Sequence, residues 1–178
     1  MKNSIRYSVL ALATAALAFS TGAFASTTAG ADLSVTANVV SECTISASGT
    51  VAFGAYGPLT NVSTGKNGTG SVSYTCSANT TSAYITLGQG ANAVAGITPS
   101  TDAIPQRQMI HGSDLLAYSL WTDSGYSLVW GNTDTTGVAA VTFNGLPHSV
   151  TVYGTVTAGQ NVPAASYSDT VVATVTYL

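Results

Sequence analysis

Residues 31–40 read ADLSVTANVV, and the same alternation of apolar and polar side chains recurs along most of the chain. One face of this stretch carries Leu33, Val35, Ala37 and Val39, whereas Asp32, Ser34, Thr36 and Asn38 fall on the other. A period of two is that of a β-strand, in which successive side chains point to opposite faces. The stretch therefore predicts a strand close to the N-terminus with one apolar face.

Helical periodicity is nearly absent after the first 25 residues. Short runs of Val, Ile, Thr, Tyr and Ala are separated by clusters of Gly, Asn, Asp and Pro, a pattern typical of an antiparallel β-sandwich. We predict an all-β chain with a leader and strand at 26–40 and one sandwich domain at 41–178. The predicted strands are 31–40, 43–47, 51–54, 70–77, 82–88, 115–122, 126–130, 137–143, 147–156 and 168–178. The stretch from about 89 to 110 predicts a surface loop.

The first 25 residues have the features of an export signal. Lys2 and Arg6 precede an apolar run at 8–19, and the run is followed by the small-x-small cleavage pattern Ala23-Phe24-Ala25. A membrane span needs roughly 20 apolar residues, so this run is short for one. We predict a cleaved signal peptide at 1–25, with an uncleaved N-terminal anchor as the alternative, and an exported mature protein.

Charged side chains are scarce in the exported part. Only Lys66 and Arg107 are basic there, against seven acidic residues in the chain. Nucleic acids and anionic lipids are bound by clustered Lys and Arg, so we expect no nucleic-acid partner and no membrane insertion. Sparse charge also removes the repulsion that keeps β-rich monomers apart, which favours self-association.

The two cysteines, Cys43 and Cys76, both lie in the exported part. Disulfides form in oxidising compartments, so we expect a single bond between them. A metal site is the weaker alternative, because a tetrahedral shell needs more ligands than two thiols and no histidine lies nearby in sequence. We expect neither a metal nor another cofactor.

Catalytic motifs are lacking, and we predict no enzymatic activity. The chain has no Gly-x-Ser-x-Gly elbow, His-Glu-x-x-His helix, P-loop or dinucleotide fingerprint, and the glycine-rich run at 65–70 indicates a turn. The following carboxylates fall in predicted loops or turns, where Asp caps turns: Asp102, Asp114, Asp123, Asp134 and Asp169. A pair of them could support glycoside hydrolysis, but no spacing selects one.

Aromatic and imidazole side chains offer a second set of candidate sites. Trp121, Trp130 and Tyr153 could stack on a sugar, but in alternating strand segments such side chains more often pack in the core or on a sheet face. His111 and His148 lie far apart in the sequence, which favours surface or turn positions for both.

The C-terminal run 168–178 also alternates, with one face formed by Val171, Ala173, Val175 and Tyr177. Natural sandwiches protect edge strands with charge, proline or a covering loop, and this run shows no such protection. Either a partner strand covers this edge, or another segment of the chain closes the fold.

Several short motifs, in this order and spacing, resemble those of the spore coat protein U family, whose members include subunits of archaic chaperone–usher pili. The resemblance covers essentially the whole mature chain. Its landmarks are Cys43, SVSYTC at 71–76, LAYSLWTD at 116–123, VWG at 129–131, VYG at 152–154, AGQ at 158–160, YSDT at 167–170 and TY at 176–177.

The resemblance implies an immunoglobulin-like sandwich that lacks its last strand. In that mechanism a periplasmic chaperone fills the groove beside the C-terminal strand, and at an outer-membrane usher the next subunit's N-terminal extension replaces it. By position, residues 31–40 would be the donor and Leu33, Val35, Ala37 and Val39 its pocket-filling side chains. The acceptor edge would carry Val171, Ala173, Val175 and Tyr177. Small Ala37 leaves the register of the donor open by two residues.

We therefore expect a structural pilus subunit of a Gram-negative bacterium, which polymerises by strand donation and supports attachment and biofilm formation. The alternatives are a secreted coat or matrix protein, or a minor tip-type binding protein, of the same family. In those alternatives residues 31–40 could be an ordinary first strand of the chain's own sandwich.

Overall fold

The computed structural model describes residues 26–47, 49–94 and 105–178, which fall into two compact units, 1–37 and 38–178. The predicted signal peptide at 1–25 lies outside the described residues. The described part of the first unit, 26–37, contains no strand, and Leu33 and Val35 are exposed there. No helix among the described residues is long and apolar enough to cross a membrane.

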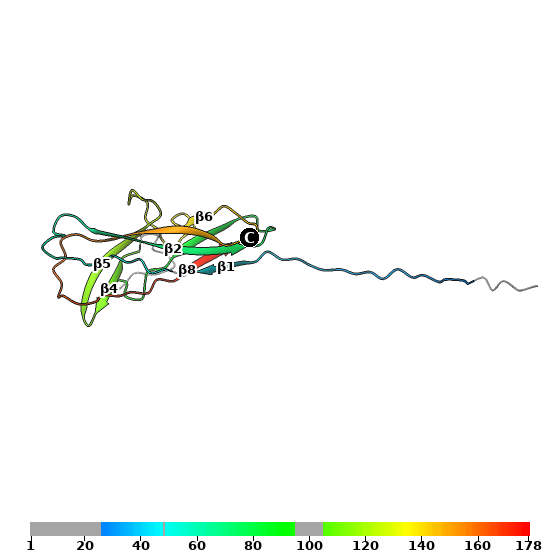
Figure 1. Ribbon diagram of the computed structural model, residues 1–178, viewed down its shortest axis with the longest axis horizontal. Helices are drawn as coiled ribbons and strands as arrows, with labels where there is room; N and C mark the ends of the chain where they lie inside the picture. Colours follow the sequence, from blue (N-terminus) through cyan, green and yellow to red (C-terminus); the bar gives the residue numbers. More distant parts are fainter. Residues whose placement is uncertain (1–25, 48, 95–104) are drawn as a thin grey trace, which may run out of the picture. The chain divides into compact units, whose positions relative to one another are not determined.

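The second unit is built from two antiparallel sheets (Figure 1). The larger sheet has the order β1-β2-β7-β5-β4 and the smaller one the order β6-β3-β8. The strands are β1 (Cys43–Ser46), β2 (Lys66–Cys76), β3 (Ala83–Leu87), β4 (Arg107–His111), β5 (Asp114–Trp121), β6 (Val138–Ala140), β7 (His148–Val156) and β8 (Ala173–Tyr177). The prediction of an all-β, antiparallel fold is confirmed.

The core lies where the inward-facing residues of both sheets meet. Every second residue of β2 is buried from Val72 to Cys76, and β5 repeats the pattern from Leu116 to Leu120. The smaller sheet contributes Ile85, which is fully buried. Outward positions on the same strands are mostly Ser, Thr and Ala, so the period of two in the sequence separates a core face from a solvent face.

One predicted loop contains a strand. Residues 89–110 were expected to lack one, but β4 pairs with β5 in the register Met109↔Leu116. The sequence RQMIH does not alternate clearly, because its first residue, Arg107, is charged and yet buried. Its guanidinium binds backbone carbonyls, a role that periodicity does not reveal. Positions 95–104 of this stretch lie outside the described residues.

Two predicted strands, 137–143 and 168–178, are shorter than expected, as β6 and β8, and three others do not form. The 51–54 and 126–130 segments are reduced to isolated bridges, Ala52↔Thr69 and Trp121↔Val129. Gly54 has a φ of 68°, which bends the chain out of the first ladder. In the second, Asp123 accepts hydrogen bonds from the backbone N–H groups of Ser127 and Leu128 and holds a loop. Residues 31–40 form no strand in the single chain.

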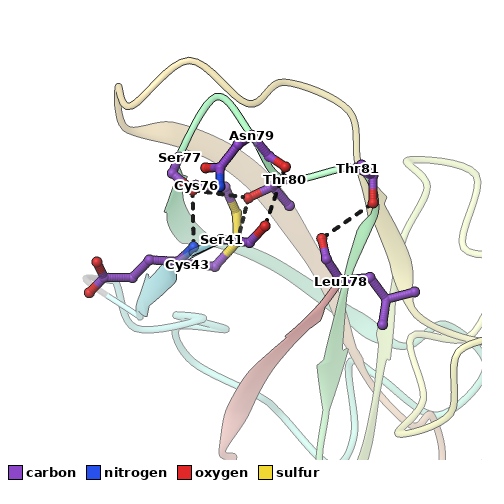
Figure 2. Close-up of a disulfide and its surroundings, with 9 residues drawn as sticks. Ser41, Cys43, Cys76, Ser77, Asn79, Thr80, Thr81 and Leu178 are labelled. Atoms are coloured by element: carbon purple, nitrogen blue, oxygen red, sulfur yellow. Dashed lines mark hydrogen bonds between the residues drawn. A yellow bond between two sulfur atoms is a disulfide. The ribbon is translucent and has the colours of Figure 1, made fainter. Parts of the chain in front are cut away.

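The predicted disulfide between Cys43 and Cys76 is confirmed, and it joins the start of β1 to the end of β2 (Figure 2). These two residues are also partners in the β-ladder, with their Cα atoms 4.1 Å apart. Next to them, Glu42 N–H donates to the Ser77 hydroxyl at 2.9 Å, and Ser77 N–H donates to the Glu42 carbonyl at 2.8 Å. The disulfide and these bonds anchor the chain where it enters the sandwich.

Replacing both cysteines (Cys43→Ala with Cys76→Ala) should lower the free energy of unfolding by about 3–4 kcal/mol, because the bond closes a 33-residue loop in the unfolded chain. Urea unfolding of the two proteins measures the difference. As a control, a reductant should bring the wild type to the level of the variant and leave the variant unchanged. A wild type that unfolds identically with and without reductant would contradict the expectation.

Candidate functional site

β1 and β8 each form an edge of their sheet, and they lie next to each other in space. β8 pairs only with β3, and β1 only with β2, among the residues that the structure describes. The outer backbone N–H and C=O groups of such edges are a template for another strand. Of the predicted acceptor residues, Val171, Ala173 and Val175 pack against the core, and Tyr177 is 37% exposed.

A groove continues from these edges, between the segment after β1 and the segment before β8. Its first cavity has a volume of about 330 Å³. Residues between 47 and 53 line one side and residues 167–171 the other. Core side chains that are at most 3% exposed also line it, including Val72, Leu87 and Leu120. An apolar side chain that enters this cavity would therefore contact the core directly.

A second cavity, of about 540 Å³, lies farther along the same groove. Residues 50–56 form one wall and residues 162–167 the other, with Leu116 and Val156 from the core. Five residues line both cavities and therefore lie where the two meet. We call this set the waist: Thr50, Val51, Phe53, Met109 and Tyr167. The groove thus has two chambers that meet at these side chains.

The wall formed by residues 50–56 is seated closely on the larger sheet by glycine. A Cβ atom at Gly154 would lie 2.8 Å from Cε1 of Phe53 and 2.7 Å from Cγ1 of Val51. A Cβ atom at Gly68 would lie 2.5 Å from the carbonyl oxygen of Ala52. Only glycine allows the two backbones this approach. Phe53 therefore cannot move toward the sheet to widen the waist.

The opposite wall is held by the side chain of Asp169. One carboxylate oxygen accepts hydrogen bonds from the backbone N–H groups of Ala91 and Asn92, at 2.9 and 3.2 Å, and from the Asn92 side-chain amide at 3.0 Å. The other accepts a hydrogen bond from the Tyr118 hydroxyl at 2.6 Å. Tyr118, which belongs to β5, and Asp169 both line the first cavity. Their hydrogen bond therefore attaches this wall of the cavity to the larger sheet.

Arg107 lies beneath this wall and is 1% exposed. Its guanidinium donates hydrogen bonds to the carbonyl oxygens of Gly88 and Leu87, both at 2.8 Å, and of Trp130 at 2.9 Å. Burial lowers the pKa of Arg107 to about 10, against an opposing effect of Tyr118 and Asp169. The same environment raises the pKa of Tyr118 well above its ordinary value, through burial first and then the hydrogen bond to Asp169.

Comparison with known families shows which family the chain belongs to. The model of the Spore Coat Protein U domain matches residues 29–174, which is most of the chain. The chain belongs to the spore coat protein U family. A curated relative, Protein U of Myxococcus xanthus, is 44% identical over 183 residues, which cover 98% of this chain and 99% of that protein.

A solved structure with the same fold comes from archaic chaperone–usher pili. It is the complex of the chaperone CsuC with the tip adhesion subunit CsuE, from the Csu pili of Acinetobacter baumannii. The similarity has a TM-score of 0.53 at 23% identity over 77% of this chain, and this chain spans 40% of the length of the matched one. The likeness is one of fold, and it confirms the predicted immunoglobulin-like sandwich.

The other candidate residues of this spore coat protein U chain are not brought together. Trp130 is fully buried and donates a hydrogen bond from its indole N–H to the Ile85 carbonyl at 2.9 Å, so it belongs to the core. His111, at the end of β4, packs on Tyr167, whereas His148, at the start of β7, packs on Tyr74 of β2. The two histidines therefore have different neighbours. Within the described residues, no group of three or more His, Cys, Asp or Glu side chains could hold a metal ion.

The interaction between Tyr118 and Asp169 was not predicted from the sequence. Asp169 was one of several carboxylates expected in loops, and its partner is 51 positions away. The one available signal was that both residues belong to the family landmarks, in LAYSLWTD and YSDT. Nothing in either motif alone indicates that they meet.

Tyr118→Phe should lower the free energy of unfolding near neutral pH, and the difference from the wild type should shrink as the pH rises above 10. Above pH 10 the unfolded tyrosine ionises while folded Tyr118 stays protonated, so its contribution to stability declines as the pH rises. The limiting slope is about 1.4 kcal/mol per pH unit. Urea unfolding of both proteins between pH 8 and about 11 measures the difference, and a gap between them that stays constant would contradict the prediction.

Proposed function

We propose that this protein is a structural pilus subunit that polymerises when residues 31–40 of one copy enter the groove of the next. The observation that carries the proposal is the groove itself, which is lined by core side chains and continues from two sheet edges that have no partner strand among the described residues. Strand addition at such an edge supplies main-chain hydrogen bonds, and pockets at every second residue supply specificity. A segment in which apolar and polar residues alternate is therefore the kind of ligand that this groove fits.

The segment 31–40 offers what the groove lacks. Leu33 is 86% exposed, Val35 85% and Val39 79%, and all three lie on the same face of an extended strand. Burying a branched aliphatic side chain contributes roughly 1.5–3 kcal/mol. Because the incoming strand completes the recipient's core, its binding also stabilises the recipient's fold. A filament of high stability then forms without covalent links between subunits.

The contact between copies would be heterologous, since a strand on one copy meets a groove on another. Such contacts need not close into a ring and give open filaments. The membership of the spore coat protein U family and the fold shared with a subunit from a chaperone–usher pilus support this reading. The proposed partners are therefore identical or related subunits, a periplasmic chaperone and an outer-membrane usher. The proposed role is surface attachment and biofilm formation, without catalysis.

A secreted coat protein is the second candidate. It is favoured by the full-length similarity to Protein U and by the name of the family, Spore Coat Protein U. A coat protein that does not polymerise through residues 31–40 has no need of a free donor face. The two candidates therefore differ in whether disruption of that face abolishes assembly.

Two variants test strand donation. Both lack residues 26–40, and one carries a copy of residues 31–40 after Leu178 through a short flexible linker. We expect the variant with the added strand to stay monomeric and to unfold at a temperature higher by roughly 10 °C or more, because the strand buries its apolar side chains in the groove. Calorimetry and size-exclusion chromatography measure the two properties.

Matched substitutions in the added strand provide the control. Leu33→Asp in the copy should remove most of the gain in stability, whereas Ser34→Asp, on the opposite face, should retain it. Two variants that unfold at the same temperature would mean that the sandwich closes without this strand, and strand donation would then be rejected.

A further inference from the structure

The groove and the proposed donor strand have matching irregularities. The donor's apolar face carries Leu33, Val35, Ala37 and Val39, of which only Ala37 is small. The groove has two chambers that meet at the waist, where the bulky side chains of Phe53, Met109 and Tyr167 line both. A strand with larger side chains on both sides of an alanine can place the larger ones in the chambers and the small one beside these bulky side chains.

We propose that Ala37 of the incoming copy lies at the waist, with Leu33 and Val35 in the first cavity and Val39 in the second. This inference rests on the proposed function and assigns the register of the donor strand. Alternate residues of a strand lie about 6.6 Å apart, so the side chains on either side of Ala37 reach the adjoining chambers.

The direction of the strand follows from the sheets that it joins. Every ladder in the two sheets is antiparallel, and antiparallel pairing is slightly the more stable. The wall at 162–173 runs from the second cavity toward the first. A donor that pairs antiparallel to the wall at 162–173, which leads into β8, is parallel to the opposite wall at 47–56 and runs from the first cavity toward the second. This direction places Leu33 and Val35 before the waist and Val39 after it.

In this register the donor must come from a second copy. Ala52, which lies between the waist residues Val51 and Phe53, pairs with Thr69 of β2, and Cys43 pairs with Cys76 of the same strand. Thr69 and Cys76 are seven residues apart, so Ala52 and Cys43 are separated by about 23 Å. The waist and Cys43 are thus farther apart than the four residues from Val39 to Cys43 can span, which is at most about 14 Å. The chain's own segment therefore cannot adopt this register, because the disulfide holds Cys43 too far from the second cavity for Val39 to reach it.

The waist cannot easily yield to a larger side chain. The ring of Phe53 lies so close to Gly154 that a Cβ atom there would be 2.8 Å from its Cε1 atom. Phe53 also packs on Tyr118, with the ring centroids 5.9 Å apart. Tyr118 is in turn bonded to Asp169. Enlarging Ala37 would therefore overpack the site, whereas the cavity of about 540 Å³ leaves space beyond the valine at position 39.

The test uses filaments assembled from the full mature chain, in which position 37 lies outside the sandwich unit, so that substitution there leaves the recipient fold intact. Ala37→Leu should make heat or detergent dissociate the filaments about tenfold faster or more. Val39→Leu should leave the rate unchanged or lower it. Thr36→Leu, on the opposite face of the strand, is the matched control for added bulk and should behave like the wild type.

A second substitution identifies the contact. Met109→Ala widens the waist, and combined with Ala37→Leu it should restore most of the lost kinetic stability, while it should not improve a Val35→Leu donor. If Ala37→Leu filaments are as durable as the wild type and Val39→Leu or Val35→Leu filaments dissociate fast, the register is shifted by two residues and the proposal is wrong. If the wild type forms no filaments, strand donation itself fails, and the register fails with it.

Discussion

The unpaired edges of β1 and β8 are the constraint on which the rest of this structure depends. Beside them lies a groove that is lined by core side chains such as Leu87 and Leu120. A sandwich left open in this way forgoes part of the apolar burial that stabilises a closed one. In the proposed assembly, the feature that weakens the single subunit would give a strand from another molecule its binding energy, and this would link assembly to folding.

Most of the fold could be predicted from the sequence because its main signal is local. Strict alternation predicted the segments that became β2, β5 and β7, and the two cysteines predicted their bond. The boundaries were less accurate where glycine was involved. The run at 65–70 was expected to be a turn, but Lys66–Gly70 belongs to β2, and Gly68 is required there because Ala52 lies against it. A glycine that permits close approach and a glycine that permits a turn look alike in a sequence.

The candidate site could be predicted only in part, because its walls are held by contacts between distant residues. Asp169 meets Tyr118 and the backbone of Ala91, and Arg107 meets carbonyls of three other segments. Neither set of contacts is indicated by a periodic pattern or by a fixed spacing in the sequence. Arg107 is also the reason that the sequence predicts a loop where β4 forms, since a buried charge contradicts the pattern of a strand unless its partners are known. The division of the groove into two chambers likewise depends on residues from three separate segments.

An uncovered edge also has consequences before assembly. β8 contains no charged residue and no proline, and Val172 beside it is 67% exposed. The nearby carboxylate of Asp169 is occupied by hydrogen bonds within the subunit. Such an edge would pair with any strand that it meets, and the low charge of the chain offers little repulsion. In the proposed assembly, the groove of such a subunit would have to be covered from folding until polymerisation. A strand-donating chaperone would meet this requirement with the same chemistry as the next subunit.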